Sequence, residues 1–316
     1  MESSLHHLLE QTIRLYFYPE AQLITYTTQP MRQDEQGYSG ASLARHDLIF
    51  VDPRGEQHAV TLITKEALLR ERRVLHLLTS QGHCVPFSHT LDLTTDGPAL
   101  ICQQDVSAEA LPTPPDSQRQ VARCLARIHT MNLRRAEDLA WLPPADHAYF
   151  QDVILADYRE QLALASQRPG FAVEYADVIG QMEWAVEPFL STMDALWSAG
   201  NSLTLIHADM MDDHVLTHAG QPYVIDWGQA RYGSFYLDLP NFFTPDTVLF
   251  YRDALAELGL DIPTDEFMRC YGQAGRYPGF KYIGFLLSLW GQGQLDALNG
   301  PLLQQLIHGT PTPPSL

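Results

Sequence analysis

The chain lacks several features that mark common classes of protein. It has 316 residues, and its N-terminus, M-E-S-S-L-H-H, has no basic segment followed by an apolar stretch, so no secretory signal is expected. The longest apolar run, near Tyr282–Trp290, is too short to cross a bilayer. The four cysteines are scattered, and none forms a C-x-x-C pair. These absences favour a cytoplasmic protein that does not act at a membrane.

Basic residues are also scarce, with 20 Lys and Arg against 38 Asp and Glu, which gives a formal net charge of −18. Residues 107–316 carry most of the excess, with 25 acids and 12 bases. Binding to nucleic acid needs a basic face, so nucleic acid is not an expected partner. An acidic surface would suit a cationic small molecule, although a solvated acidic surface accounts for the charge equally well.

Two acidic motifs in the second half of the chain carry the strongest functional signal. The first is H-A-D-M-M-D-D-H at residues 207–214, and the second is Y-V-I-D-W-G at residues 223–228. Phosphoryl transfer needs one acid to orient and deprotonate a hydroxyl nucleophile, and another to hold Mg²⁺ on the nucleotide phosphates. Protein kinases place these acids in H-R-D-x-x-x-x-N and D-F-G. By this comparison Asp209 is the expected base and Asp226 the expected metal ligand.

The residues around the two motifs predict short strands. Residues 203–206 and 215–217 have β-type composition on either side of the first motif. A turn containing Gly220 and Pro222 then returns the chain to Asp226, so a hairpin is expected. Such a hairpin can hold two carboxylates from separate chain positions at one cleft.

These motifs resemble those of the aminoglycoside phosphotransferase and choline kinase-like family of small-molecule kinases. That family typically shows H-G-D-x-x-x-x-N, then I-D-W or I-D-F, then G-x-x-x-x-D-L, and the third piece is present as G-S-F-Y-L-D-L at residues 233–239. Three pieces in the right order are more specific than any one alone, although the acids could also be solvated loop residues. The resemblance implies that His207 and Asp238 support the catalytic loop structurally.

The fold that the resemblance implies is a bilobal, α+β protein kinase-like fold. Residues 1–103 would form a small antiparallel-sheet lobe with one helix, and residues 104–316 a larger, mostly helical lobe with the hinge, the catalytic hairpin and the acceptor-binding helices. The residue pattern agrees with this plan. Strands are predicted at 22–27, 43–51, 58–63, 85–92 and 99–103. Helices are predicted at 1–15, 66–79, 116–129, 147–168 and 175–199 and after residue 238.

The resemblance also assigns nucleotide-binding residues in the first lobe. The segment G-Y-S-G-A, with Gly37, Ser39 and Gly40, is similar to the family's nucleotide loop, where small residues bring backbone N–H groups close to phosphates; a plain turn is the alternative. The stretch containing Gln103 and Asp105 would be the hinge, whose backbone groups contact the adenine edge in the family.

Lys65 and Glu71 are the candidates for the phosphate-binding lysine and its acidic partner. The chain has only two lysines, Lys65 and Lys281, so a lysine at the end of the third predicted strand is suggestive. The alternative is that Thr64 caps the next helix, which would leave Lys65 on a solvent-facing first turn. Glu71 would then be an ordinary acid on the surface of that helix.

His214 departs from the family, which has Asn at this position. Imidazole nitrogen is a poorer Mg²⁺ ligand than an amide oxygen. His214 could bind Mn²⁺, could hydrogen-bond Asp209, or could mark a catalytically impaired pseudokinase that binds a nucleotide or metabolite. A metal-dependent hydrolase using His207, Asp209 and His214 is a further alternative, but it leaves the other two motifs unexplained.

The sequence therefore favours a phosphotransferase that moves the γ-phosphate of ATP or GTP, with Mg²⁺ or Mn²⁺, to a hydroxyl of a small molecule. The acceptor could be cationic, such as an aminoglycoside or amino-alcohol. The expected partners are the nucleotide and this acceptor, and the expected state is a monomer or a homodimer.

Overall fold

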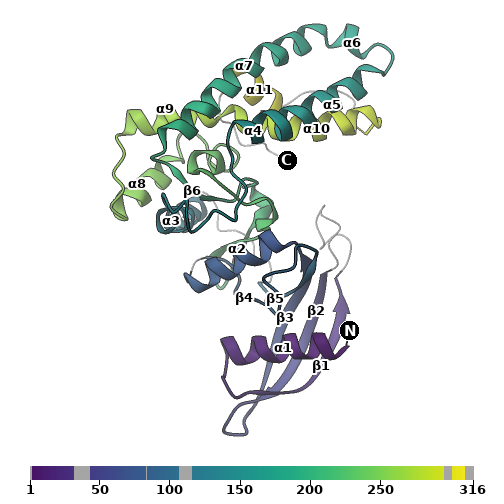
Figure 1. Cartoon of the computed structure of the whole chain (residues 1–316), viewed down its shortest axis with the longest axis vertical. Coiled ribbons are helices and arrows are strands. Elements are labelled where there is room, and N and C mark those ends of the chain that lie inside the picture. Colours follow the sequence, from purple (N-terminus) through teal and green to yellow (C-terminus); the bar gives the residue numbers. More distant parts are fainter. Residues whose placement is uncertain (1, 32–42, 83, 107–115, 295–300, 310–316) are drawn as a thin grey trace. The chain divides into compact units, whose positions relative to one another are not determined.

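The computed structural model describes residues 2–31, 43–82, 84–106, 116–294 and 301–309. The chain divides into two compact units. The first unit contains residues 1–112 and 213–230, and the second contains residues 113–212 and 231–316 (Figure 1). The prediction of a lobe boundary at residue 103 stays a prediction. No helix in the described ranges is long and apolar enough to span a bilayer.

The first unit is built on an antiparallel sheet of five strands in the order β1-β2-β3-β5-β4. The strands are β1 (Gln22–Pro30), β2 (Leu43–Val51), β3 (Gln57–Ala67), β4 (Ser88–Thr90) and β5 (Ala99–Gln104). Leu48 and Phe50 of β2 are buried, whereas Asp47 and Ile49, which alternate with them, are exposed. This period of two is the pattern of a strand that packs one face against a core. The predicted strands are therefore present, although β4 is shorter than expected.

Helix α1 (Glu2–Tyr16) supplies the cover for that face of the sheet. Its residues Leu8, Leu9 and Ile13 are buried in one apolar cluster with Phe50 of β2 and Leu62 of β3 (Figure 1). Helix α2 (Leu69–Ser80) follows β3 and is the one helix inserted among the strands. Helices were predicted at 1–15 and 66–79, and α2 is the one helix that the expected lobe has among its strands.

A two-stranded hairpin also belongs to the first unit. Strands β7 (Val215–His218) and β8 (Gln221–Val224) pair antiparallel, and the two residues between them, Ala219 and Gly220, both have positive φ, at 49° and 72°. Two central residues with positive φ are typical of the tight turn whose twist matches a hairpin. The short 3₁₀ helix η4 (Trp227–Gln229) follows β8, so the hairpin delivers Asp226 as predicted.

The second unit is mostly helical. Its helices are α3 (Asp116–Met131), α4 (His147–Tyr149), the π-helical η2 (Phe150–Ile154), α5 (Leu155–Ser166), α6 (Phe171–Glu174), α7 (Ala176–Ala199), α8 (Leu249–Glu257), α9 (Thr264–Ala274), α10 (Arg276–Gly291) and α11 (Pro301–His308). Figure 1 shows α5 and α10 side by side, and these helices are in contact. A mixed α+β structure with a helical second half is therefore confirmed.

A two-stranded sheet inside the second unit explains one glycine of the sequence motif. Strand β6 (Leu203–Ile206) pairs antiparallel with β9 (Arg231–Ser234), a strand that the sequence did not predict. A Cβ on Gly233 would lie 2.8 Å from the Cβ of Ala145 and 2.9 Å from Cδ1 of Ile206. These distances are too short for a side chain, so β9 packs here because residue 233 is glycine. The strand then leads into the 3₁₀ helix η5 (Phe235–Asp238), which ends on the predicted aspartate.

Candidate active site

The first unit holds an ion pair between Lys65 and Glu71. Lys65 lies on β3, and its Nζ is 2.5 Å from Oε1 of Glu71 in the first turn of α2. The spacing of six residues suffices because β3 ends at Ala67 and α2 begins at Leu69. The alternative of Lys65 on a first helical turn is therefore wrong. Both side chains are mostly covered, with 14% and 8% of their surface exposed, so the ion pair fixes the ammonium in place.

Asp226 and His214 lie close to this ion pair. Asp226 Oδ1 is 3.9 Å from Nζ of Lys65, and its Oδ2 is 3.6 Å from Nε2 of His214. The hairpin brings them together, since Ile225 N donates to His214 O at 2.9 Å. The Asp226 side chain is 41% exposed and its backbone has φ of 61°, a conformation that aspartate tolerates better than most residues. A half-exposed carboxylate is a suitable ligand for a metal ion, and the ammonium beside it is a suitable partner for phosphate groups bound to that ion.

Asp226 and His214 offer an oxygen and a nitrogen to the metals that the sequence suggested. Carboxylate oxygen is a ligand that Mg²⁺ and Mn²⁺ prefer, so Asp226 fits either ion. His214 adds an imidazole nitrogen on the same side of the hairpin. A different group of possible ligands is formed by Asp52, Glu56 and His58, the one such group in the described ranges. Asp52 Oδ1 accepts from the N–H groups of Arg54 and Glu56, both at 2.9 Å, so this group closes the β2–β3 turn.

The structure describes the residues of the expected hinge but not those of the expected nucleotide loop. Gly37, Ser39 and Gly40 lie outside the described residues. Gln103 lies on β5 and pairs with Ile63 of β3, and Asp105 follows the end of that strand. Asp105 Oδ2 accepts from Nε of Arg45 on β2 at 2.8 Å. Arg45 pairs with Ile63, which lies two residues before Lys65 on β3. The side chains of Arg45, Ile63 and Lys65 therefore share one face of the sheet.

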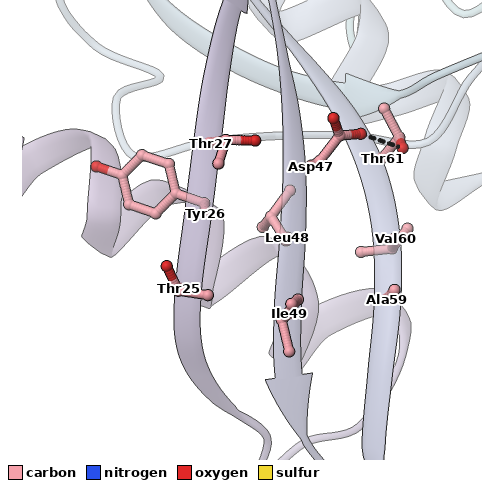
Figure 2. Close-up of a pocket in the computed structure, with 9 residues that line it drawn as sticks. All are labelled: Thr25, Tyr26, Thr27, Asp47, Leu48, Ile49, Ala59, Val60 and Thr61. Carbon is pink, nitrogen blue, oxygen red and sulfur yellow. Dashed lines mark hydrogen bonds between the residues drawn. The ribbon is translucent and has the colours of Figure 1, made fainter.

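A shallow groove occurs further along the outer face of β1, β2 and β3. Figure 2 shows the nine residues that line it, which include Thr25, Asp47, Ile49 and Thr61. Asp47 Oδ1 accepts from the Thr61 hydroxyl at 2.8 Å, so two of its polar side chains are already bound to each other (Figure 2). None of the predicted site residues lines this groove.

In the second unit, Asp238 holds the backbone at the start of the H-x-D motif. Its side chain is fully buried, Oδ2 accepts from His207 N at 2.7 Å, and Oδ1 accepts from Ala208 N at 2.7 Å. Nε2 of His129 is 3.2 Å from Oδ2. Bonds from N–H groups to a carboxylate are among the stronger hydrogen bonds in proteins. The G-x-x-x-x-D-L motif therefore contributes a clamp on the H-x-D motif.

The clamp matters because Ala208 has a left-handed backbone. Its φ is 62°, where the family typically has glycine and where a residue with a Cβ costs roughly 1–2 kcal/mol. The Ala208 carbonyl accepts from the Tyr277 hydroxyl at 2.9 Å and from the Lys281 ammonium. The His207 ring is buried, and its Nδ1 accepts from Asp209 N at 3.3 Å. The loop is thus held from both sides of the peptide. The structural role of His207 stays a prediction.

Asp209 itself contacts two side chains of α10. Its Oδ1 is 2.7 Å from Nζ of Lys281 and accepts from the Tyr282 hydroxyl at 2.6 Å. The Asp209 side chain is 21% exposed. Burial, followed by the Asp209 charge, raises the pKa of Tyr282 well above its usual value, so the phenol keeps its proton and acts as a donor. Reasoning from the motifs missed both partners, although the scarcity of lysine was a signal for Lys281.

The family model described as "Phosphotransferase enzyme family" matches residues 37–271. No curated protein matches the sequence at a significant level.

Three solved structures share the fold. The first is a spectinomycin phosphotransferase in complex with ADP and spectinomycin, with a TM-score of 0.60 and 12% identity over 96% of this chain and 98% of that one. The second is a choline kinase from Cryptosporidium parvum Iowa II, with a TM-score of 0.55 and 13% identity over 95% and 92%. The third is an aminoglycoside 2′-phosphotransferase mutant in its GDP complex, with a TM-score of 0.51 and 17% identity over 92% and 93%.

These identities are low, so the likeness to the solved structures establishes the protein kinase-like fold alone. The family model is the finding that reaches further, because it spans well over half of the chain and contains each of the three motifs. The chain belongs to the phosphotransferase enzyme family.

Proposed function

We propose that this protein transfers the γ-phosphoryl group of ATP or GTP to a hydroxyl of a small molecule. The observation that carries the proposal is the Lys65 ammonium, which lies 2.5 Å from Glu71 and 3.9 Å from Asp226. In protein kinases an ion pair of this kind and a nearby metal-binding aspartate must both be in place for phosphoryl transfer. The three residues come from β3, α2 and the end of the β7–β8 hairpin. Their proximity is therefore produced by the fold and not by adjacency in the sequence.

Lys65 would bind phosphate oxygens of the nucleotide, with Glu71 keeping its ammonium in position. The hinge backbone at Gln103 and Asp105 and the loop with Gly37, Ser39 and Gly40 would contribute the remaining nucleotide contacts. Asp226, with His214 beside it, would hold Mg²⁺ or Mn²⁺. When bound, such an ion neutralises charge on the phosphate oxygens. Catalysis of this type comes mostly from positioning and electrostatics.

Asp209 would accept the proton of the acceptor hydroxyl. In that step the hydroxyl oxygen forms a bond to the γ-phosphorus, and the bond between this phosphorus and the bridging oxygen breaks. The bridging oxygen keeps the electron pair and leaves with the β-phosphate. A side chain that accepts a proton in this way contributes about 10²–10⁴-fold to a rate. The excess of acids after residue 106 would suit a cationic acceptor, and we take the protein to act in the cytoplasm as a monomer or homodimer.

Calorimetry of ATP and GTP binding, with and without Mg²⁺, tests the nucleotide part of this proposal. The wild type should bind at least one nucleotide more tightly with Mg²⁺ than without it. Asp226→Ala should remove most of that dependence, because it deletes the proposed metal ligand. Asp96→Ala, an exposed acid of the same unit, is the matched control and should behave like the wild type. A failure of the wild type to bind either nucleotide would contradict the proposal.

A further inference from the structure

Two adjacent residues of α10 converge on the side chain of Asp209. Lys281 approaches Oδ1 with its ammonium at 2.7 Å, and Tyr282 donates its hydroxyl to the same oxygen at 2.6 Å. Both residues lie 72 or 73 positions after Asp209 in the chain, so the contact is tertiary. Neither residue belongs to the motifs that identify the family.

The environment of Lys281 shows that its ammonium has a fixed position. The side chain is only 12% exposed, and a buried ammonium is costly unless its charge and its donors are matched. Asp209 supplies the opposite charge, and the Ala208 carbonyl accepts a second hydrogen bond. The rings of Tyr277 and Tyr282 have their centroids 5.9 Å and 5.3 Å from Nζ, within the range of cation–π attraction. Lys281 therefore joins the carboxylate of Asp209 to the backbone of the left-handed residue before it.

Tyr282 complements this arrangement as a neutral donor. Its raised pKa keeps the phenol protonated across the range in which enzymes work, so it does not add a second negative charge beside Asp209. Two donors on one oxygen fix the plane of a carboxylate, and the plane sets the direction in which the other oxygen points. Misplacing a catalytic group by about 1 Å can cost roughly 100-fold in rate.

We propose that Lys281 and Tyr282 are positioning residues for Asp209, which hold its carboxylate in the orientation that accepts the acceptor's proton. This proposal rests on the proposed function, because it assigns a role to two residues in that reaction. The ion pair with Lys281 fixes the loop and the carboxylate together, and the Tyr282 hydroxyl fixes the carboxylate alone. Loss of Lys281 therefore harms catalysis more than loss of the Tyr282 hydroxyl.

Steady-state kinetics of four variants measure these roles. Lys281→Met, which keeps the length of the side chain without its charge, should lower kcat about 100-fold. Tyr282→Phe should lower kcat about tenfold, as expected for one hydrogen bond to a charged group. The KM for the nucleotide should stay within about twofold in both variants, since their contacts are to Asp209 and Ala208. Lys281→Arg should recover part of the kcat lost in Lys281→Met, because it restores the charge.

Tyr271→Phe is the matched control for the loss of a buried tyrosine hydroxyl in the same unit. Its hydroxyl donates to Phe243 O at 2.5 Å, and Phe243 lies outside the H-x-D motif of residues 207–214. A kcat for Lys281→Met within twofold of the wild type would overturn the proposal. A fall in kcat for Tyr271→Phe as large as that for Tyr282→Phe would also overturn it, because the effect would then be general destabilisation.

An NMR experiment tests the contact without any need for turnover. The chain has two lysines, so protein labelled with ¹⁵N at lysine Nζ has two side-chain ammonium signals, from Lys65 and Lys281. Asp209→Asn should shift the Lys281 signal and leave the Lys65 signal in place, and Lys281→Arg identifies which signal is which. A Lys281 signal that ignores Asp209→Asn overturns the proposal even if phosphoryl transfer is found. If the Lys281 signal shifts in Asp209→Asn but the protein consumes no nucleotide, the proposed function is contradicted and the ion pair is still supported.

Discussion

The hydrogen bonds to Asp238 predict how much stability the variant Asp238→Asn should lose. Asp238→Asn keeps the shape of the side chain but replaces one acceptor oxygen by an NH₂ donor and removes the charge. The native carboxylate accepts from two buried backbone N–H groups, each at 2.7 Å, and Asn can satisfy only one of them. Each hydrogen bond to a charged group is worth roughly 1.5–3 kcal/mol, and a buried donor without a partner costs roughly 1–3 kcal/mol more. Asp238→Asn should therefore destabilise the protein by about 2.5–6 kcal/mol.

Urea unfolding, followed by tryptophan fluorescence, measures this loss as a shift of the midpoint at constant slope. The matched control is Asp246→Asn, an exposed acid of the same unit, which should change the free energy of unfolding by less than about 0.5 kcal/mol. The variant Asp238→Asn should also lose phosphoryl transfer where it is still folded, because Ala208 would leave its left-handed conformation. A destabilisation below about 1 kcal/mol would refute the argument that this carboxylate holds the loop.

Three further variants test separate parts of the account. Ala208→Gly should relieve the left-handed φ of 62° and leave stability unchanged or raise it by up to about 1 kcal/mol, as urea unfolding will show; a clear loss would mean that the methyl group is needed for packing. His214→Asn should lower kcat with both Mg²⁺ and Mn²⁺ if the imidazole near Asp226 has its own role, whereas a gain confined to Mg²⁺ would identify it only as a poor ligand. Gly279→Ala should destabilise the protein by about 1–3 kcal/mol, because its Cβ would lie 2.5 Å from the backbone N of Leu306 in α11. An unchanged melting temperature in a thermal shift assay would contradict that packing.

The fold and the outline of the site could be predicted because local signals agreed with one another. Strand β2 shows alternating burial, and the turn between β7 and β8 contains Gly220, which accepts positive φ without steric cost. Asp238 could be expected to support the catalytic loop, and its hydrogen bonds to His207 and Ala208 give that expectation a physical content. The ion pair of Lys65 and Glu71 could be named but not established, since its existence depended on where β3 ends.

The partners of Asp209 could not be predicted in the same way. Residues 276–291 read as a largely apolar helix, and a sequence pattern does not tell which distant loop such a helix contacts. Lys281 and Tyr282 are adjacent, so no helical periodicity sets them apart as a pair. Strand β9 was missed because its sequence, R-Y-G-S, has neither a run of β-branched residues nor an apolar alternation that would predict a strand. What decided both cases was tertiary packing.

Detection of the phosphorylated product is the most direct test of the central claim. The wild type, with ATP or GTP and with Mg²⁺ or Mn²⁺, should convert at least one member of a panel of small hydroxyl compounds to its phosphate ester, measured by mass spectrometry. Asp209→Asn should form this product at least ~10²-fold more slowly while it binds the nucleotide with nearly the same affinity. Equal product formation by the variant would contradict the role of Asp209, and absence of both product and nucleotide binding in the wild type would contradict the account as a whole.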